Sequence, residues 1–362
     1  MAMLTEREQE VLEAVIRTYV ETAEPAGSRV VAKRHGLGVS PATIRNTMAD
    51  LEEKGFLYHP HTSAGRVPTD LAYRYYVDRL MRPARVSVAE QRRLRRELTE
   101  ETGDLERLFE QAAHALGLLT GELGIAVAPR LDDAVLEKLE LISFSSEKVL
   151  LVLTLTHGLV RTVYVDVQAS VPAAALVAIT MALNERLAGR TLREIRSTLA
   201  DRLRDVQVGD HSAATHLLNV FLQSKEEIFD LRDPSREELH LGRASVLAQQ
   251  PEFASGSQLR NLIELTERRD LLVRALGVGP RDQDTTLQIS IGTENAVPEL
   301  SSFTLVTSQY RAGGVSGVIG VIGPTRMPYE KVAAIVEYTS VLVSELLRLP
   351  GGGAKSSRAS SN

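Results

Sequence analysis

Four neighbouring residues of this sequence, Thr43, Arg45, Asn46 and Thr47, have side chains that suit the reading of DNA bases. An arginine can donate two hydrogen bonds to O6 and N7 of guanine, and an asparagine can pair with N6 and N7 of adenine. The methyl group of a threonine can contact the methyl group of thymine. This chemistry requires a helix that presents these side chains to a major groove while its opposite side is buried.

Other residues nearby suit contacts with the phosphates that flank such bases. Ser28, Arg29 and Ser40 fall at expected helix starts, where hydroxyl and backbone N–H groups can hold a phosphate. His61 and Arg66 lie in the stretch HPHTSAGR, from which we expect contacts with an adjacent backbone or minor groove. An isolated Arg-Asn pair on a helix is more often a solvated surface, so the assignment depends on the surrounding elements.

The elements around these residues predict a helix-turn-helix. A capping-box pattern, TERE, starts a first helix whose apolar residues repeat at helical spacing until about Glu21. Ser28 is expected to cap a short second helix, RVVAKRH, which glycines end. After a four-residue turn, Ser40 and Pro41 start a third helix. Its buried side is expected to contain Ile44, Met48 and Leu51.

A short hairpin is expected after the third helix. Residues 56–58 have a strand pattern, HPHTSAGR forms a loop tip, and Val67 returns the chain, which together make the wing of a winged helix. The segment TDLAYRYYVDRLM predicts a fourth helix that ends at Pro83. We therefore assign residues 1–85 to a winged-helix DNA-binding domain and residues 86–103 to a linker helix.

The remainder of the chain mixes helix and strand patterns, so the expected fold class is α+β with several domains. Within residues 104–190 a helix pattern comes first, a strand pattern follows and stops near residue 170, and residues 172–188 return to helix. The strand pattern restarts near residue 286, within residues 284–348, whereas residues 191–283 are mostly helical and polar. We interpret this as one α+β domain interrupted by a helical insertion; two consecutive domains would give a similar pattern. Residues 349–362 have nothing to bury and are expected to form a disordered tail.

The totals limit the class of protein. With 362 residues, of which 43% are hydrophobic and 25% charged, the chain has the composition of a soluble multidomain protein. The absence of cysteine excludes disulfides, thiolate nucleophiles and cysteine-based zinc sites. No apolar run has the roughly 18 to 20 residues of a membrane span, and the N-terminus does not resemble a signal peptide. We therefore expect a cytoplasmic protein with no membrane partner.

The distribution of charge favours one basic face. The formal net charge of -5 alone argues against a nucleic-acid partner. Residues 1–85 contain 12 basic and 11 acidic side chains, but no acidic residue lies between Glu24 and Asp50. Four basic residues fall in that stretch: Arg29, Lys33, Arg34 and Arg45. One surface can therefore be basic while the domain as a whole is nearly neutral.

Other motifs give weaker hypotheses. His59 and His61 have the spacing of half a zinc site, but cysteine is absent and the nearest further histidine is His35, so we expect no metal and no cofactor. The glycine-rich residues 313–324 lack the GK[ST] ending of a phosphate loop and alternate as a strand does. Arg326 precedes a helix start and could hold either an anion ligand or the domain's own backbone. No motif places a Ser/His/Asp set, which favours a protein that is not an enzyme.

Several segments resemble the heat-inducible transcription repressors of the HrcA family. The most specific block is SPATIRNTMADLEEKGFLYHPHTSAGRVPTDLAYRYYVD. It follows LTEREQEVLEAVIRTYVETAEPAGSRVVAK and is followed much later by IGTEN and GVIGVIGPTRMPYEKV. The resemblance spans nearly the whole folded chain, although residues 191–283 match no motif individually. It implies three domains: a winged helix, a GAF-like domain, and a dimerisation domain inserted into the GAF-like domain.

The resemblance also implies a function. It implies a homodimer that represses chaperone operons by binding an inverted repeat in double-stranded DNA, with the GroE chaperonin keeping the repressor active. Heat diverts the chaperonin to unfolded clients, and transcription rises. An alternative hypothesis is a small-molecule-sensing winged-helix regulator that binds an anion near Arg326 of the GAF-like domain. A third is a hydrolase that uses the histidines.

Overall fold

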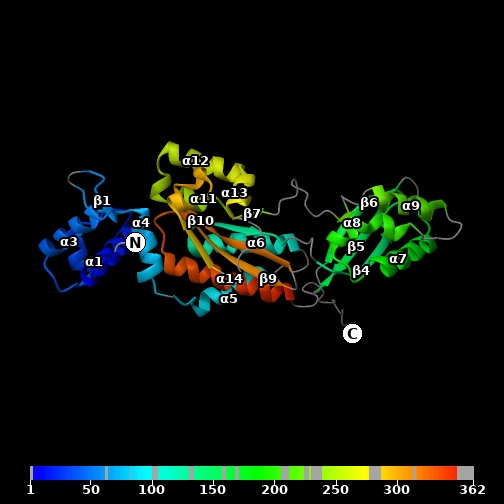
Figure 1. The fold of residues 1–362 in the computed structure, drawn as a ribbon, viewed down its shortest axis with the longest axis horizontal. Coiled ribbons are helices and arrows are strands. Elements are labelled where there is room, and N and C mark those ends of the chain that lie inside the picture. The colour runs from blue at the N-terminus through cyan, green and yellow to red at the C-terminus, as the bar shows by residue number, and fades with distance from the viewer. Residues whose placement is uncertain are drawn as a thin grey trace, which may run out of the picture.

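The computed structural model describes residues 3–61, 64–82, 84–99, 105–129, 134–156, 160–167, 171–204, 212–223, 228–229, 239–276, 287–312 and 315–348. These residues form an N-terminal unit, a central lobe and a distal lobe, with the central lobe between the other two (Figure 1). The mixture of helices and strands is the expected α+β class. None of the helices in these ranges is long and apolar enough to cross a membrane.

The N-terminal unit contains three helices, a two-stranded hairpin, and a fourth helix that continues into a π-helical turn. Its elements are α1 (Glu6–Thr22), α2 (Ser28–His35), α3 (Pro41–Glu53), β1 (Leu57–Tyr58), β2 (Val67–Pro68), α4 (Asp70–Tyr75) and the π-helical turn Tyr76–Leu80. The predicted capping box is confirmed, because Thr5 and Glu8 each accept a hydrogen bond from the other's backbone amide. The predicted start of the third helix at Pro41 is also confirmed.

The elements of this unit pack together through buried apolar side chains. The apolar side of α1 packs against α2 and α3, as its helical spacing predicts. The buried residues of α1 include Val11, Leu12, Val15 and Ile16. Phe56 and Tyr75 add an edge-to-face ring contact, with 5.5 Å between the ring centroids. Only one side of α3 packs against these residues, and its other side is exposed.

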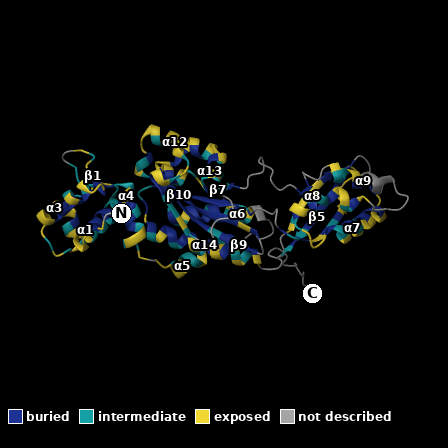
Figure 2. Ribbon diagram, in the orientation of Figure 1, coloured by how far each residue is buried: buried dark blue, intermediate teal, exposed yellow. Residues whose placement is uncertain are grey.

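The central lobe is built on an antiparallel five-stranded sheet in the order β7-β3-β10-β9-β8. Its strands are β3 (Leu123–Val127), β7 (Leu239–Leu241), β8 (Leu287–Ile291), β9 (Phe303–Ala312) and β10 (Val315–Pro324). Helices cover both faces (Figure 1). On one face lie α6 (Leu105–Thr120) and α14 (Tyr329–Arg348), and on the other α11 (Ser245–Ala248), α12 (Gly256–Glu267) and α13 (Arg269–Leu276). The three inner strands β3, β9 and β10 are accordingly almost entirely buried, whereas the edge strands β7 and β8 are only partly buried (Figure 2).

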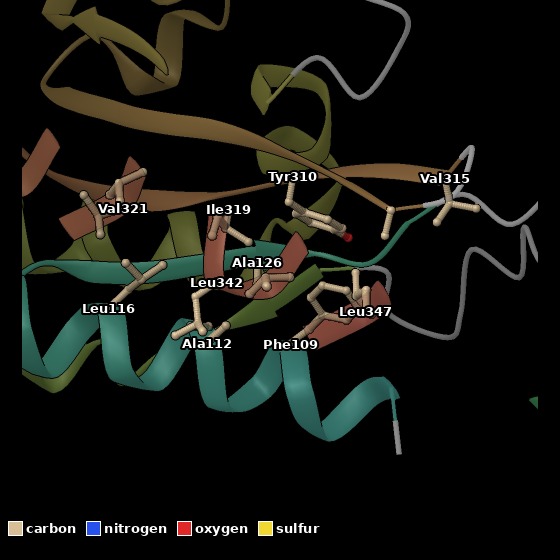
Figure 3. Packing of buried hydrophobic residues seen from close by; sticks show 14 of the residues in the cluster. Phe109, Ala112, Leu116, Ala126, Tyr310, Val315, Ile319, Val321, Leu342 and Leu347 are labelled. Atoms are coloured by element: carbon tan, nitrogen blue, oxygen red, sulfur yellow. The ribbon is translucent and has the colours of Figure 1, made fainter. Parts of the chain in front are cut away.

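Alternate residues of β3 pack into different layers, because successive side chains of a strand point to opposite faces. Leu123, Ile125 and Val127 join the cluster with α11 to α13, whereas Ala126 joins the cluster with α6 and α14. In that second cluster α6 points its apolar side at the sheet, as Figure 3 shows for Phe109, Ala112 and Leu116. A Cβ at Gly124 would lie 1.9 Å from the carbonyl oxygen of Ala113, so glycine lets α6 lie directly on β3.

The expected linker helix, α5 (Val88–Thr99), packs on the central lobe. Its Leu94 and Leu98 are fully buried, and the helix contacts α6. Glu90 lies 3.5 Å from Lys331 of α14. This segment therefore connects the N-terminal unit to the central lobe as a packed element.

The distal lobe contains a second antiparallel sheet, in the order β4-β5-β6. Its elements are β4 (Leu136–Ser143), β5 (Lys148–Leu155), β6 (Val160–Asp166), α7 (Ala173–Leu187), α8 (Leu192–Leu203) and α9 (Ser212–Gln223). α7 packs on β4, and α8 and α9 contact α7. Asn184 of α7 fixes this packing, because its side chain accepts from the amide of Leu139 at 2.8 Å and donates to the carbonyl oxygen of Leu139 at 2.7 Å.

The domain boundaries predicted from the sequence are wrong in two places. The strands of residues 136–166 form their own sheet instead of joining the later strands, and β7 and α11 to α13 belong to the central lobe instead of the insertion. The segment inserted between β3 and β7, which forms the distal lobe, covers the described residues 134–229 rather than 191–283. It contains strands as well as helices. A strand pattern reports burial but not which sheet the strand joins. The expected boundary at 283/284 and the tail 349–362 lie outside the described residues.

Candidate nucleic-acid interface

A glycine-containing turn separates α2 from α3. α2 ends at His35, and the next residue, Gly36, has a φ of 56°, in the left-handed region that glycine adopts without strain. Ser40 then caps α3, and its hydroxyl accepts a hydrogen bond from the amide of Thr43 at 3.1 Å. Pro41 occupies the first helical position, where its missing N–H has no cost. The local sequence thus fixes where α3 begins and which residues face outward.

One side of α3 is buried and the other is open. Ile44, Met48 and Leu51 are at most 3% exposed, as the apolar spacing predicts. Thr43, Arg45 and Asn46 lie on the exposed side of the N-terminal half of the helix. The structure therefore brings three of the predicted base-reading side chains together on one surface.

Thr47 is not part of that surface, and the prediction that it faces outward is wrong. Its exposed fraction is 7%, and its hydroxyl donates to the carbonyl oxygen of Thr43 at 3.2 Å. Position 47 lies three residues after Ile44 and four before Leu51, which puts it on the buried side of the helix. A threonine is tolerated there because its hydroxyl bonds to the backbone of its own helix.

The basic residues around α3 differ in their partners. Arg34 pairs with Glu21 at 2.8 Å. Arg29, Lys33 and Arg45 are exposed, and none of the three forms an ion pair with a residue that the structure describes. A cation without an internal partner keeps its attraction for an external phosphate. Lys33 was not among the predicted site residues, and its signal was the lack of acidic residues in this stretch.

Ser28 is displaced by one position from its predicted capping role. Gly27 caps α2 with an extended backbone (φ -83°, ψ 143°) and no side-chain hydrogen bond, and Ser28 is the first helical residue. The side chain of Ser28 is buried, so the predicted hydroxyl contact with a phosphate is wrong. Only the backbone N–H of Ser28 remains suited to that contact. Arg29 beside it is exposed.

The loop between β1 and β2 contains two of the residues predicted to contact DNA, one exposed and one paired within the protein. His61 is exposed in the loop. Arg66 pairs with Glu52 of α3 at 2.7 Å, and its backbone exchanges hydrogen bonds of 2.8 and 3.0 Å with Ala26. Arg66 therefore fixes the loop to α3, which corrects its predicted role as a free phosphate contact. Tyr58 of β1, which sequence reasoning missed, is 47% exposed beside this loop.

Contacts with α1 hold the second and third helices in place. Lys54, at the end of α3, lies 2.5 Å from Glu8 of α1. That hydrogen bond lowers the pKa of Glu8 and outweighs the opposite effect of burial. At the end of α2, His35 lies 2.9 Å from the hydroxyl of Thr18, and burial lowers the pKa of His35. The exposed side of α3 therefore belongs to a fixed platform.

The predicted anion site at Arg326 is filled by the protein itself. The guanidinium donates to both carboxylate oxygens of Glu252 and to the carbonyl oxygen of Val20 at 2.8 Å. This corrects the interpretation of Arg326 as a ligand-binding residue. Within the described ranges, no group of three His, Cys, Asp or Glu side chains is arranged to hold a metal ion, and His59 lies 4.0 Å from Glu52.

The chain is similar to known proteins over nearly its whole length. The family described as HrcA protein C terminal domain matches residues 106–333. A heat-inducible transcription repressor HrcA of Chlorobium phaeobacteroides (strain BS1) is 38% identical over 352 residues, which cover 95% of this chain and 98% of the relative. The protein of the same name from Geobacter sulfurreducens is 38% identical over 348 residues, which cover 96% of this chain and 99% of the relative.

One solved structure has a related fold. It is described as the crystal structure of a hypothetical protein at 2.2 Å resolution, and it matches with a TM-score of 0.62 and 22% sequence identity. The match covers 96% of this chain and 99% of that chain. The likeness therefore extends through the N-terminal unit and both lobes.

Proposed function

The chain belongs to the HrcA family of heat-inducible transcription repressors, and we propose that it binds its operator as a winged helix, with α3 in the major groove. As a transcription repressor it is not an enzyme. In a helix-turn-helix, the second helix enters the major groove and its N-terminal residues contact bases. The observation that carries the proposal is the open N-terminal half of α3, where Arg45 is exposed and has no ion pair in the described part of the chain.

Each residue of this surface has a role in the proposal. Thr43, Arg45 and Asn46 read bases, because their side chains leave the helix on its open side. Arg29 and Lys33 hold phosphates, together with the backbone and hydroxyl of Ser40 at the start of α3. The loop with His61, the wing, contacts the DNA beside the bases that α3 reads.

We further propose that two copies bind an inverted repeat. One recognition helix reads few base pairs, and each mismatch costs only about 1 to 3 kcal/mol, so a single unit discriminates poorly within a genome. A two-fold dimer doubles the readout and requires a DNA site with matching symmetry.

The distal lobe offers a surface suited to this dimer. The register of its sheet aligns Ile142, Leu150 and Tyr164 on the face that α7 does not cover. Ile142, Phe144 and Tyr164 are 49%, 61% and 56% exposed, and the rings of Phe144 and Tyr164 lie 5.1 Å apart. Exposed apolar and aromatic side chains that gather on one face are typical of a protein contact. We assign dimerisation to this lobe, in line with the family resemblance.

The proposed regulation follows the same resemblance. The GroE chaperonin keeps the repressor active in the cytoplasm, and heat stress diverts the chaperonin, so that the operators of chaperone genes are released. An anisotropy titration compares the inverted repeat upstream of the organism's own chaperonin operon with a scrambled copy, with and without chaperonin. We expect salt-dependent binding to the repeat alone, strengthened by chaperonin. Equal affinity for both sequences would overturn sequence-specific repression.

Arg45→Ala tests the role of α3 in the same titration. We expect operator binding to weaken by about 1 to 3 kcal/mol and discrimination to relax at one base pair, because a bidentate base contact is lost. Arg274→Ala is the matched control, since Arg274 is an exposed arginine of α13 that pairs with Asp270 in the same helix at 2.9 Å. Unchanged operator affinity in Arg45→Ala would remove α3 from the proposal.

A further inference from the structure

We propose that Arg74 and Arg326 are positioning residues that fix the direction of α3 relative to the central lobe and thereby set the half-site spacing that the dimer accepts. This inference rests on the proposed binding of a dimer to an inverted repeat. In such binding, the distance between the two recognition helices determines the separation of the half-sites. One base pair corresponds to about 3.4 Å along the DNA, so a small rotation of the N-terminal unit changes which operators fit.

Arg74 joins α4 to the turn that follows β8. Its Nε donates to one carboxylate oxygen of Glu294 at 2.8 Å, and its Nη2 donates to the other at 2.5 Å. Nη2 also donates to the carbonyl oxygen of Ile289 at 2.5 Å. A planar guanidinium with two parallel bonds to one carboxylate fixes orientation as well as distance. This contact therefore resists rotation of α4 on the central lobe.

The same turn approaches α4 at a second point. The amide of Thr293 donates to the carboxylate of Asp70 at 3.2 Å. Gly292 has a φ of 53°, and a Cβ there would lie 2.0 Å from the Asp70 carboxylate. Glycine alone combines this left-handed backbone with such a close approach. The IGTEN segment is thus shaped to receive the start of α4.

Arg326 joins the central lobe to the far end of α1. It is held by Glu252, and its Nη1 donates to the carbonyl oxygen of Val20, in the last turn of α1. Carbonyl groups at a helix end lack a helical partner, and a positive charge is favourable there. α1 has no basic residue of its own in this turn. Arg326 supplies that charge from the central lobe, and its side chain is only 13% exposed.

An apolar contact accompanies the two arginines. Tyr73 of α4 is 1% exposed, and its ring centroid lies 5.6 Å from that of Tyr329, the first residue of α14. Glu330 accepts hydrogen bonds from Tyr76 at 3.0 Å and from Arg17 at 3.4 Å. Burial of rings holds two surfaces together without fixing their angle, because the hydrophobic effect has no direction. The angle is fixed by directional contacts: those of Arg74 and Arg326, made to different helices, and the hydrogen bonds that Glu330 accepts.

The test measures binding to inverted repeats whose half-sites are moved together or apart one base pair at a time, and to a single half-site. Arg74→Lys and Arg326→Lys keep the charge but cannot form the two-bond contact. We expect wild-type protein to prefer one spacing by about tenfold or more, because both units bind only where the geometry allows. The variants bind all spacings within about threefold of one another, with half-site affinity unchanged.

Two further variants separate positioning from folding. Glu294→Gln breaks the Arg74 contact from the other side, and we expect the same broadened profile. Arg95→Lys is the matched control, since Arg95 pairs with Glu345 at 3.4 Å within the central lobe, and it keeps the wild-type profile. An N-terminal unit that had unfolded would lose half-site binding, which the second measurement detects. A sharp optimum in Arg74→Lys, Arg326→Lys and Glu294→Gln overturns the positioning role. A wild-type protein without any optimum overturns the dimeric binding of an inverted repeat instead.

Discussion

The arginines of the open surface and those of the joint with the central lobe differ in their partners. Arg29 and Arg45 are exposed and make no ion pair within the described ranges, so their charge is available to DNA. Arg74 and Arg326 each bond to a carboxylate and to a backbone carbonyl group, so their charge acts inside the protein. Substitutions of Arg29 and Arg45 should therefore alter the affinity for DNA. Substitutions of Arg74 and Arg326 should alter the angle between the N-terminal unit and the central lobe.

Two carboxylates show the same contrast. Burial raises the pKa of Glu294, but hydrogen bonds from Arg74 and the amide of Ile291 outweigh it, so the pKa is lowered overall. Glu122, immediately before β3, is 2% exposed and accepts a hydrogen bond from Gln250 at 3.1 Å. Burial raises the pKa of Glu122 to about 8. The hydrogen bond from Gln250 and the charge of Arg326 lower this pKa, but they offset only part of the effect of burial. The pKa of Glu294, which has a bound arginine, is therefore lowered, whereas that of Glu122, which has none, is raised.

Glu122→Gln is the change from which we expect the largest effect on stability. The unfolded chain loses this proton near pH 4.5, but the folded protein keeps it up to about pH 8. The stabilisation is therefore complete below pH 4.5 and is lost as the pH rises toward 8, by up to about 1.4 kcal/mol per pH unit. Glutamine resembles the protonated form, so the variant should be more stable than wild type at the upper end of this range.

Denaturant unfolding at about pH 5.5 and about pH 8 measures this difference. Glu264→Gln provides the control, because it makes the same chemical change at an exposed position on α12. If wild type and Glu122→Gln lost stability equally between the two pH values, Glu122 would be ionised in the folded protein.

Arg29→Ala and Arg34→Ala sharpen the comparison between free and paired arginines on α2. We expect Arg29→Ala to weaken binding to all DNA sequences alike and to reduce the slope of log K against log salt by about 1, because one phosphate contact is lost. Arg34→Ala should change the slope less, since Arg34 already pairs with Glu21. Anisotropy titrations at several salt concentrations measure both slopes. Equal losses in the two variants would show that the internal partner does not matter.

Thr47→Val should have the smallest effect and tests the corrected position of Thr47. Valine keeps the shape of the buried side chain but removes one hydrogen bond, which contributes about 1 kcal/mol or less to stability. Operator affinity should stay within about twofold of wild type, because the side chain is buried and is not part of the proposed DNA-binding surface. Thermal unfolding and operator titration measure the two quantities, and Thr43→Val on the exposed side is the comparison. A change of base preference in Thr47→Val would restore its predicted role.

Local signals were sufficient to predict the elements of the N-terminal unit. The capping pattern at Thr5 and the Ser40-Pro41 start of α3 are properties of a few adjacent residues, and the structure confirms both. The apolar spacing also indicated that Thr47, which lies between Ile44 and Leu51, is on the buried side of α3. We predicted exposure because threonine is polar. A helical wheel that weighted position above residue type would have found it.

Contacts between distant segments could not be predicted. Arg74 and Glu294 are separated by 220 positions, and the sequence around each shows only a charged residue on a helix or in a turn. The Arg326–Glu252 pair was concealed for the same reason, because 74 positions separate its members. Alternating apolar residues indicate a buried strand but do not name its neighbour, which is why residues 136–166 were assigned to the wrong sheet.

The distal lobe leaves the central sheet and returns to it at neighbouring points. β3 ends at Val127, β7 begins at Leu239, and these two residues pair directly in the antiparallel sheet. A short turn between paired ends of this kind makes an ordinary hairpin, so a few residues could replace the whole intervening segment without changing the path of the sheet. Insertions at such sites are tolerated because the host keeps its own core. The central lobe thus has the organisation of a host domain, and the distal lobe that of an inserted domain. Recombination could add or remove the inserted domain as one segment.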